Sequence, residues 1–128
     1  MLRCCADDSG FTLLEIIAAM VIISILAAVA IPRYISLDES AKQKSITAGI
    51  AELNGRESLT WSNLKISESG YQDDTQLFGL MDTSLGQDYS WDGGAPDSSG
   101  GTLVFRLSTP APLSRLGSTS EYPAQWSR

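Results

Sequence analysis

The chain has 128 residues and a formal net charge of −6 at pH 7; it has no histidine, and its two cysteines are Cys4 and Cys5. This length favours one domain with one modest core, and the acidic balance argues against a nucleic-acid partner. Because both cysteines lie at the extreme amino terminus, the rest of the chain offers no thiol nucleophile, no disulfide and no Cys/His metal site.

The first element is a long apolar segment. The stretch 11–31 has 21 residues, and Glu15 is its only charged side chain. A helix of that length is roughly 30 Å long, which matches the hydrocarbon core of a bilayer. The pattern therefore predicts one membrane-spanning helix. Glu15 is costly near hydrocarbon unless it is paired or protonated, so it is a candidate functional residue, unless it lies at headgroup level and extends outward.

The sequence around this segment matches a known pattern. Residues 10–15 read GFTLLE, and IPRY follows the apolar run at 31–34. This closely resembles the amino terminus of type IV prepilins and type II secretion pseudopilins. In that family a membrane peptidase cuts after the glycine and methylates the new terminal residue. The resemblance thus implies cleavage between Gly10 and Phe11, N-methylation of Phe11, a subunit-assembly role for Glu15 and a helix kink at Pro32.

The resemblance also implies an organisation and a set of partners. It makes 1–10 a prepilin leader, 11–34 a transmembrane and assembly helix, and 35–128 a soluble pilin-like head. The expected partners are other filament subunits, the prepilin peptidase and an inner-membrane assembly platform. The subunit would span the inner membrane once with its head in the periplasm, and then join a periplasmic or cell-surface filament. The choice between pilus and type II secretion pseudopilus stays open.

Charge pairing gives a physical reason for the assembly role. Cleavage would leave a free amine on Phe11 at the membrane edge, and Glu15 of a neighbouring subunit could neutralise it. Two charges that are costly alone would become less costly together. The pairing would favour adding each subunit at a defined axial stagger.

An ordinary secretory signal is the alternative for this segment. The residues 28–30 read AVA, a site at which signal peptidase could cut to release a small secreted binding domain beginning at Ile31. Against it stand Glu15 inside the run, the length of the run, an acidic amino-terminal region and Pro32 just behind the cut.

The helical pattern continues beyond the proline. Ile46, Ile50 and Leu53 recur at helical spacing among polar residues, which predicts an amphipathic continuation over about 36–67. Glycine lowers helix stability, so a bend or break is expected near Asn54-Gly55. The second half of this helix should pack into the head.

The remainder predicts a small sheet. Residues 71–87 are expected to form a loop with a short helical turn around 77–81. Alternating patterns predict strands at Tyr89–Trp91 and Leu103–Leu107, separated by a turn over 93–101, and a third near 122–126. Pro110 and Pro112 should interrupt any strand at that point. The expected fold class is α+β, with the long helix packed at its carboxy-terminal half against an antiparallel sheet within about 88–128.

The candidate chemistry is sparse. Asp88, Asp92 and Asp97 are weak calcium candidates, because major pseudopilins hold calcium in a head loop, yet their spacing matches no EF-hand and loop aspartates commonly form turns. Otherwise no cofactor and no metal are expected. No nucleotide-binding, hydrolase or metalloprotease motif is present, so the sequence indicates a structural subunit rather than an enzyme.

Overall fold

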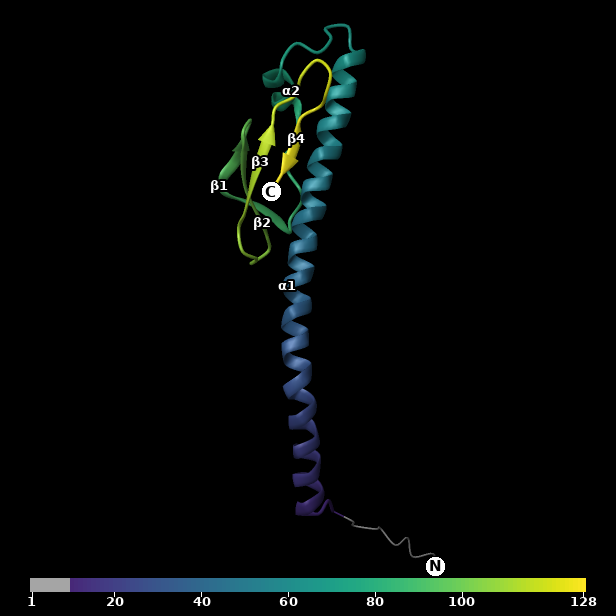
Figure 1. The fold of residues 1–128 in the computed structure, drawn as a ribbon, viewed down its shortest axis with the longest axis vertical. Helices are drawn as coiled ribbons and strands as arrows, with labels where there is room; N and C mark the ends of the chain where they lie inside the picture. Colours follow the sequence, from purple (N-terminus) through teal and green to yellow (C-terminus); the bar gives the residue numbers. More distant parts are fainter. Residues whose placement is uncertain (1–9) are drawn as a thin grey trace, which may run out of the picture. The chain divides into compact units, whose positions relative to one another are not determined.

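The computed structural model describes residues 10–128, and its elements are shown in Figure 1. In chain order they are α1 (Leu13–Ile66), α2 (Asp74–Leu80), β1 (Tyr89–Asp97), β2 (Gly100–Phe105), β3 (Ala111–Leu116) and β4 (Gln125–Ser127). The chain divides into two compact units: an amino-terminal unit that extends to Glu39 and a head unit, Ser40–Arg128. The expected α+β class, a long apolar helix and a small antiparallel sheet, is confirmed.

Helix α1 has 54 residues, close to the predicted extent. Pro32 lies inside the helix and does not end it, so the kink expected there stays a prediction. The break expected near Asn54-Gly55 is wrong, because the helix continues through both residues. The penalty for a helical glycine is about 1 kcal/mol, whereas burying a leucine side chain such as Leu53, which is 0% exposed, contributes about 2 kcal/mol.

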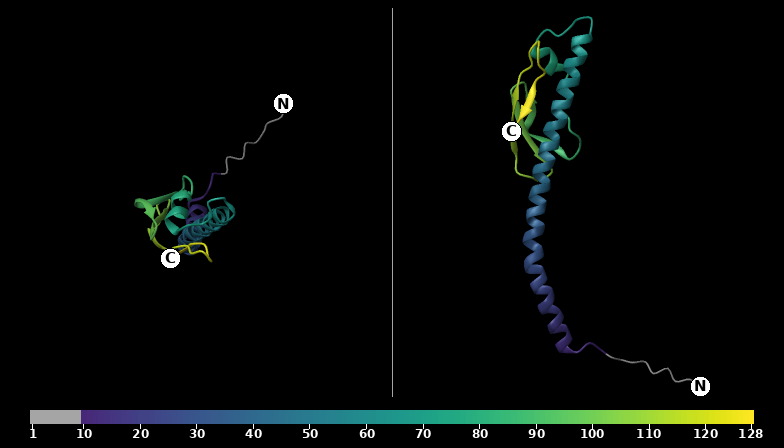
Figure 2. Two further views of the ribbon diagram at one scale, coloured as in Figure 1. Left: turned by 90° about the horizontal axis from the view of Figure 1, so that it is seen from above. Right: turned by 45° about the vertical axis from the view of Figure 1, so that its right-hand side comes forward.

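Gly49 brings this helix close to the sheet. A Cβ atom at this position would lie 3.1 Å from side-chain atoms of both Leu103 and Tyr89, so the absence of a side chain allows the close approach. The Tyr89 hydroxyl donates a hydrogen bond to the carbonyl of Ser45 on the same helix (2.8 Å). Figure 2 shows the sheet lying along the carboxy-terminal half of α1, as the sequence predicted.

The sheet has four antiparallel strands in the order β1-β2-β3-β4. Two of the predicted strands are confirmed as β1 and β2, and the third is found as the short β4. Strand β3 contradicts the expectation that Pro112 would interrupt a strand. Pro112 pairs with Thr102 of β2, while β4 pairs only with the stretch 114–116. Pro112 therefore lies where no neighbouring strand needs the N–H group that proline lacks.

The predicted turn over 93–101 is also shorter than expected. Strand β1 continues to Asp97, and its register with β2 shifts between Asp92 and Asp97. Gly93 and Gly94 have φ values of 82° and 107°, a backbone conformation that glycine adopts without steric cost. The glycines therefore lie in an irregular stretch within the strand rather than ending it.

The core of the head joins both layers. Leu53 of α1 and Leu103 of β2 are fully buried, as is Leu77 of α2, whose helix begins where Asp73 accepts a hydrogen bond from the backbone of Gln76 (2.8 Å). The short helical turn expected around 77–81 is thus a two-turn helix that starts earlier, at Asp74. Helix α2 holds Asp74 and Leu77 against the rest of the head.

A buried arginine lies at the centre of the head. The side chain of Arg115 on β3 is 0% exposed. Its Nε donates to Glu57 of α1 (2.5 Å) and its Nη2 donates to the other oxygen of that carboxylate (3.3 Å). Its Nη1 and Nη2 also donate to the two oxygens of Asp74 at 2.7 and 2.9 Å. One planar guanidinium thus makes two bidentate contacts, a geometry that lysine cannot provide.

Neighbouring groups satisfy the remaining oxygens of these carboxylates. The indole of Trp126 donates to Glu57 (2.9 Å), and the backbone and hydroxyl of Ser118 both donate to Asp74 (2.7 Å each). The guanidinium also donates to the carbonyl of Ser98 (3.1 Å). Among the described residues, no buried side-chain nitrogen or oxygen atom lacks a hydrogen-bond partner. The ion cluster therefore joins α1, α2, β3, β4 and two loops.

The ion cluster shifts the pKa values of Asp74 and Arg115. Burial alone would raise the pKa of Asp74, but the hydrogen bonds from Arg115 and Ser118 outweigh burial and lower this pKa to about 2 from its ordinary 3.8. Burial also acts to lower the pKa of Arg115, and the two carboxylates reverse that effect and raise it. Both ionised states are therefore favoured by the folded head.

Replacing Arg115 with methionine is expected to destabilise the head by about 3–5 kcal/mol, because it leaves Glu57 and Asp74 without their cation. The matched control is Arg106→Met, which removes an exposed ion pair with Asp88 (66% and 57% exposed side chains) and should cost less than about 1 kcal/mol. Urea unfolding of the full chain in detergent, followed by tryptophan fluorescence, measures both losses of stability. The signal reports on the head, because all three tryptophans lie there. Equal losses would contradict a central role for Arg115.

The depressed pKa of Asp74 predicts that the stability of the head depends on pH. Because the folded pKa of Asp74 is depressed, its stabilisation is present above its unfolded pKa of about 3.8 and is lost as pH falls toward 2. Asp74→Asn should therefore destabilise the head near neutral pH by on the order of 2 kcal/mol, and by progressively less in acid. Urea unfolding at a series of pH values tests this, with the exposed Asp92→Asn as control. A difference that does not change with pH would refute it.

Candidate functional site

The amino-terminal part of α1 exposes nearly all of its apolar side chains. Leu13 is 77% exposed and Leu14 is 75% exposed, and the apolar window of the helix is 0% buried. Among the described residues, α1 is the one helix that is long and apolar enough to cross a membrane, a test that signal sequences near an amino terminus also pass. Among residues 10–39 this apolar surface is exposed, and exposed apolar surfaces of such extent are typical of membrane or protein contacts.

Thr12 and Glu15 form a reciprocal cap at the start of this helix. The backbone N–H and the hydroxyl of Thr12 donate to Oε2 of Glu15 at 2.8 and 2.9 Å, and the backbone N–H of Glu15 donates to the Thr12 hydroxyl at 3.2 Å. This is a capping box, in which Thr12 is the N-cap and Glu15 the third helical residue. The carboxylate also lies at the positive end of the helix dipole.

The capping box was readable in the sequence and sequence reasoning missed it. Residues 12–15 read TLLE, which is the expected S/T-x-x-E/Q spacing ahead of an apolar run. Only one carboxylate oxygen, Oε2, takes part in these hydrogen bonds. The other oxygen takes no part in this cap. The structure thus gives Glu15 a local role that is compatible with pairing.

The expected cleavage position lies just before this cap. Gly10 and Phe11 are exposed and precede the first residue of α1, and no atom lies within 4 Å of a Cβ placed on Gly10. An exposed, non-helical peptide bond is the form that a peptidase requires. The rest of the predicted leader, residues 1–9, lies outside the described residues.

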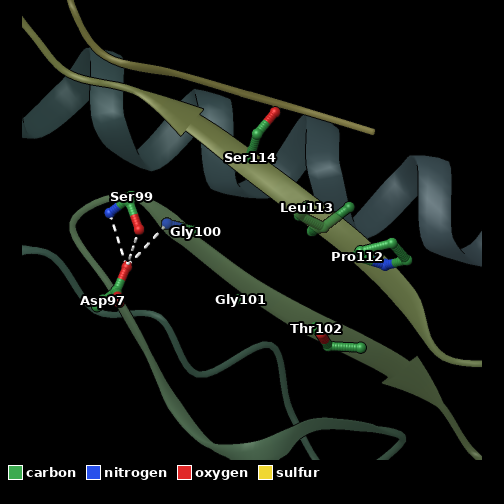
Figure 3. Close-up of a pocket in the computed structure, with 8 residues that line it drawn as sticks. All are labelled: Asp97, Ser99, Gly100, Gly101, Thr102, Pro112, Leu113 and Ser114. Carbon is green, nitrogen blue, oxygen red and sulfur yellow. Dashed lines mark hydrogen bonds between the residues drawn. The ribbon is translucent and has the colours of Figure 1, made fainter.

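The three calcium candidates have separate roles in the head. Asp88 pairs with Arg106 (3.1 Å), and Asp92 is exposed on β1. Asp97 accepts hydrogen bonds from the hydroxyl and the backbone of Ser99 (2.6 and 2.8 Å) and from the backbone of Gly100 (3.1 Å), which closes the β1–β2 turn (Figure 3). The Ser99 donors lower the pKa of Asp97. In residues 10–128 no group of three His, Cys, Asp or Glu side chains is placed to hold a metal ion.

A shallow cavity of about 340 Å³ opens beside this turn (Figure 3). It is lined by Asp97, Ser99, Gly100, Gly101, Thr102, Pro112, Leu113 and Ser114. The hydrogen-bonding oxygen of Asp97 is already occupied by the turn that it closes, so this aspartate has a structural role. The geometry that bears on function is therefore the amino-terminal segment rather than this cavity.

Comparison with known proteins identifies the same segment. A family model for the prokaryotic N-terminal methylation motif matches residues 5–31. The type IV narrow pilus major component PilA5 of Thermus thermophilus is 45% identical over 42 residues, which is 33% of this chain and 36% of that protein. The chain thus matches about a third of the relative's length, and no solved structure matches it. Over its amino-terminal part the chain therefore carries the prokaryotic N-terminal methylation motif and is similar to a type IV pilin, which confirms the resemblance seen in its sequence.

Proposed function

We propose that the protein is a structural, non-catalytic subunit of a type IV pilin-like filament, either a pilus or a type II secretion pseudopilus. The observation that carries this proposal is the methylation motif at residues 5–31, placed on a helix whose apolar side chains are exposed. In this proposal the chain is cleaved between Gly10 and Phe11, methylated on Phe11 and stored in the inner membrane with its head in the periplasm. The prepilin peptidase and an inner-membrane platform are its processing and assembly partners.

The exposed helix supports this proposal through its energetics. Burying apolar surface contributes about 25 cal/mol per Å², so the segment is stabilised first by lipid and then by neighbouring helices in a filament. The head supplies its own core, centred on Leu53 and Leu103, and needs no such cover. The apolar part of α1 can therefore pass from lipid to neighbouring helices during assembly while the head stays folded.

Glu15 is the residue on which assembly would depend. Its carboxylate caps its own helix through one oxygen, and in the filament it would also pair with the Phe11 amine of a neighbouring subunit. Cleavage after Gly10 creates that amine and leaves the Thr12 amide in place. The cap would thus hold the carboxylate at a fixed position for the incoming charge.

Processing is tested by the intact mass and terminal sequence of the mature protein. We expect a chain that begins at N-methylated Phe11. The matched variant Gly10→Leu should keep its leader, because a side chain at this position would block the peptidase. A mature chain that begins at Ile31 would instead establish release by signal peptidase as a small secreted domain, and the filament proposal would have to be abandoned.

Charge pairing by Glu15 is tested with two variants in one experiment. Glutamine can still accept the Thr12 hydrogen bonds and complete the capping box, whereas alanine cannot. If pairing with an amine matters, Glu15→Gln and Glu15→Ala should both lower the fraction of subunits in sheared filaments by about tenfold or more, with membrane insertion unchanged. Wild-type assembly by Glu15→Gln would show that the cap alone is sufficient.

A further inference from the structure

The head unit presents an exposed leucine at one end of strand β3. Leu107 lies in the connection between β2 and β3 and is 99% exposed. The turn around it is closed at both sides, since the backbone of Ser108 donates to the Phe105 carbonyl (3.0 Å) and the backbone of Phe105 donates to the Ser108 hydroxyl (3.2 Å). Arg106 adopts a positive φ of 52° in this turn. A large apolar side chain is thus held out from the head by a closed turn.

An apolar cavity lies at the other end of the same strand. Its volume is about 280 Å³, and it is lined by Leu116, Gly117, Thr119, Tyr122, Pro123 and Gln125. A cavity of roughly 150 Å³ is known to hold benzene, and a leucine side chain has fewer heavy atoms than benzene. Leu116 and Tyr122 on its wall are 74% and 69% exposed. The cavity is therefore large enough for one leucine side chain and open to receive it.

The cavity wall is fixed by helix α1. The indole of Trp61 donates to the carbonyl of Thr119 (2.9 Å), and Lys65 donates to the carbonyl of Ser120. Within the loop, the backbone of Thr119 donates to the carbonyl of Tyr122 (2.9 Å). These contacts preform the cavity, so that a ligand would not have to order the loop.

The charges beside the two features are complementary. Arg106 precedes Leu107, and its side chain is 66% exposed although it pairs with Asp88. Glu121 lies on the loop beside Tyr122, is exposed, and forms no ion pair with another residue of the described range 10–128. If a second copy brought its Leu107 to the cavity, its Arg106 guanidinium would come close to the Glu121 carboxylate of the first copy.

We propose that Leu107 of one copy inserts into the Leu116–Tyr122 cavity of the next copy, which rests on the proposed filament function. In Figure 1 the β2–β3 connection and the loop after β3 lie at opposite ends of the head. The contact is therefore heterologous: each copy offers its leucine at one end and its cavity at the other. Heterologous contacts that do not close into a ring build open helical arrays, the geometry that a filament requires.

Disulfide cross-linking in sheared filaments tests this contact. The chain's two cysteines, Cys4 and Cys5, precede the proposed cleavage site, so in filaments of the processed chain cysteines placed in the head report only on the head. We expect Leu107→Cys/Gln125→Cys filaments to give a ladder of covalent oligomers on oxidation, because Gln125 lines the cavity and bonded cysteines need Cβ atoms about 4 Å apart. A mixture of the two single variants should stop at dimers. The matched control is Leu80→Cys/Gln125→Cys, because Leu80 is also exposed but lies outside the β2–β3 turn. This double variant should give no ladder.

A charge-reversal pair provides a second measurement. Arg106→Glu should lower filament yield severalfold by setting two carboxylates against each other, and adding Glu121→Arg should restore it. Filaments of normal yield with no cross-links and no charge effect would overturn the head contact and leave the filament function standing. A wild-type chain that carries no methylated Phe11 and forms no filament would overturn both.

Discussion

The head depends on a single buried cation. The side chain of Arg115 has no solvent exposure, and it is held between the carboxylates of Glu57 and Asp74. Removing charges from water is costly, and such a cluster is tolerated when its buried polar atoms are hydrogen-bonded, as every buried side-chain nitrogen and oxygen atom of the described residues is. The interaction also has direction, because the N–H groups of a planar guanidinium point outward in fixed directions within one plane. It therefore links the Glu57 face of α1 to β3 through oriented hydrogen bonds.

The consequences extend through the small sheet. Because Glu57 also accepts from the Trp126 indole, the short strand β4 is attached to α1 as well as to β3. The amide of Asn54, one turn earlier, makes two hydrogen bonds to the backbone of Trp126 (3.1 and 2.7 Å). That side chain occupies the open edge of β4 in the way that another strand would, and an occupied edge cannot pair with a foreign strand.

The head and the apolar part of α1 differ in how their side chains are covered. The head satisfies its polar groups internally, whereas the apolar part of α1 exposes its side chains. The cap formed by Thr12 and Glu15 lies at the start of that exposed part. The backbone N–H of Thr12 finds its hydrogen-bond acceptor in the Glu15 carboxylate of the same helix.

The sequence by itself determined the features that depend on neighbours along the chain. Period and composition gave the extent of α1, strands β1 and β2, and the membrane-compatible segment, since side chains at helical or alternating spacing share a face whatever surrounds them. The motif at 10–15 indicated the similarity to type IV pilins because it is contiguous in the sequence.

Only the tertiary structure decided the rest. Pro112 lies within a strand because β4 does not reach it, and Asn54-Gly55 stays helical because Leu53 and Glu57 are buried on either side. Arg115 appeared in the sequence as one of nine basic residues, and nothing local marked it as buried. Its partners lie 58 and 41 residues away, so their attraction exists only after folding has brought three elements together.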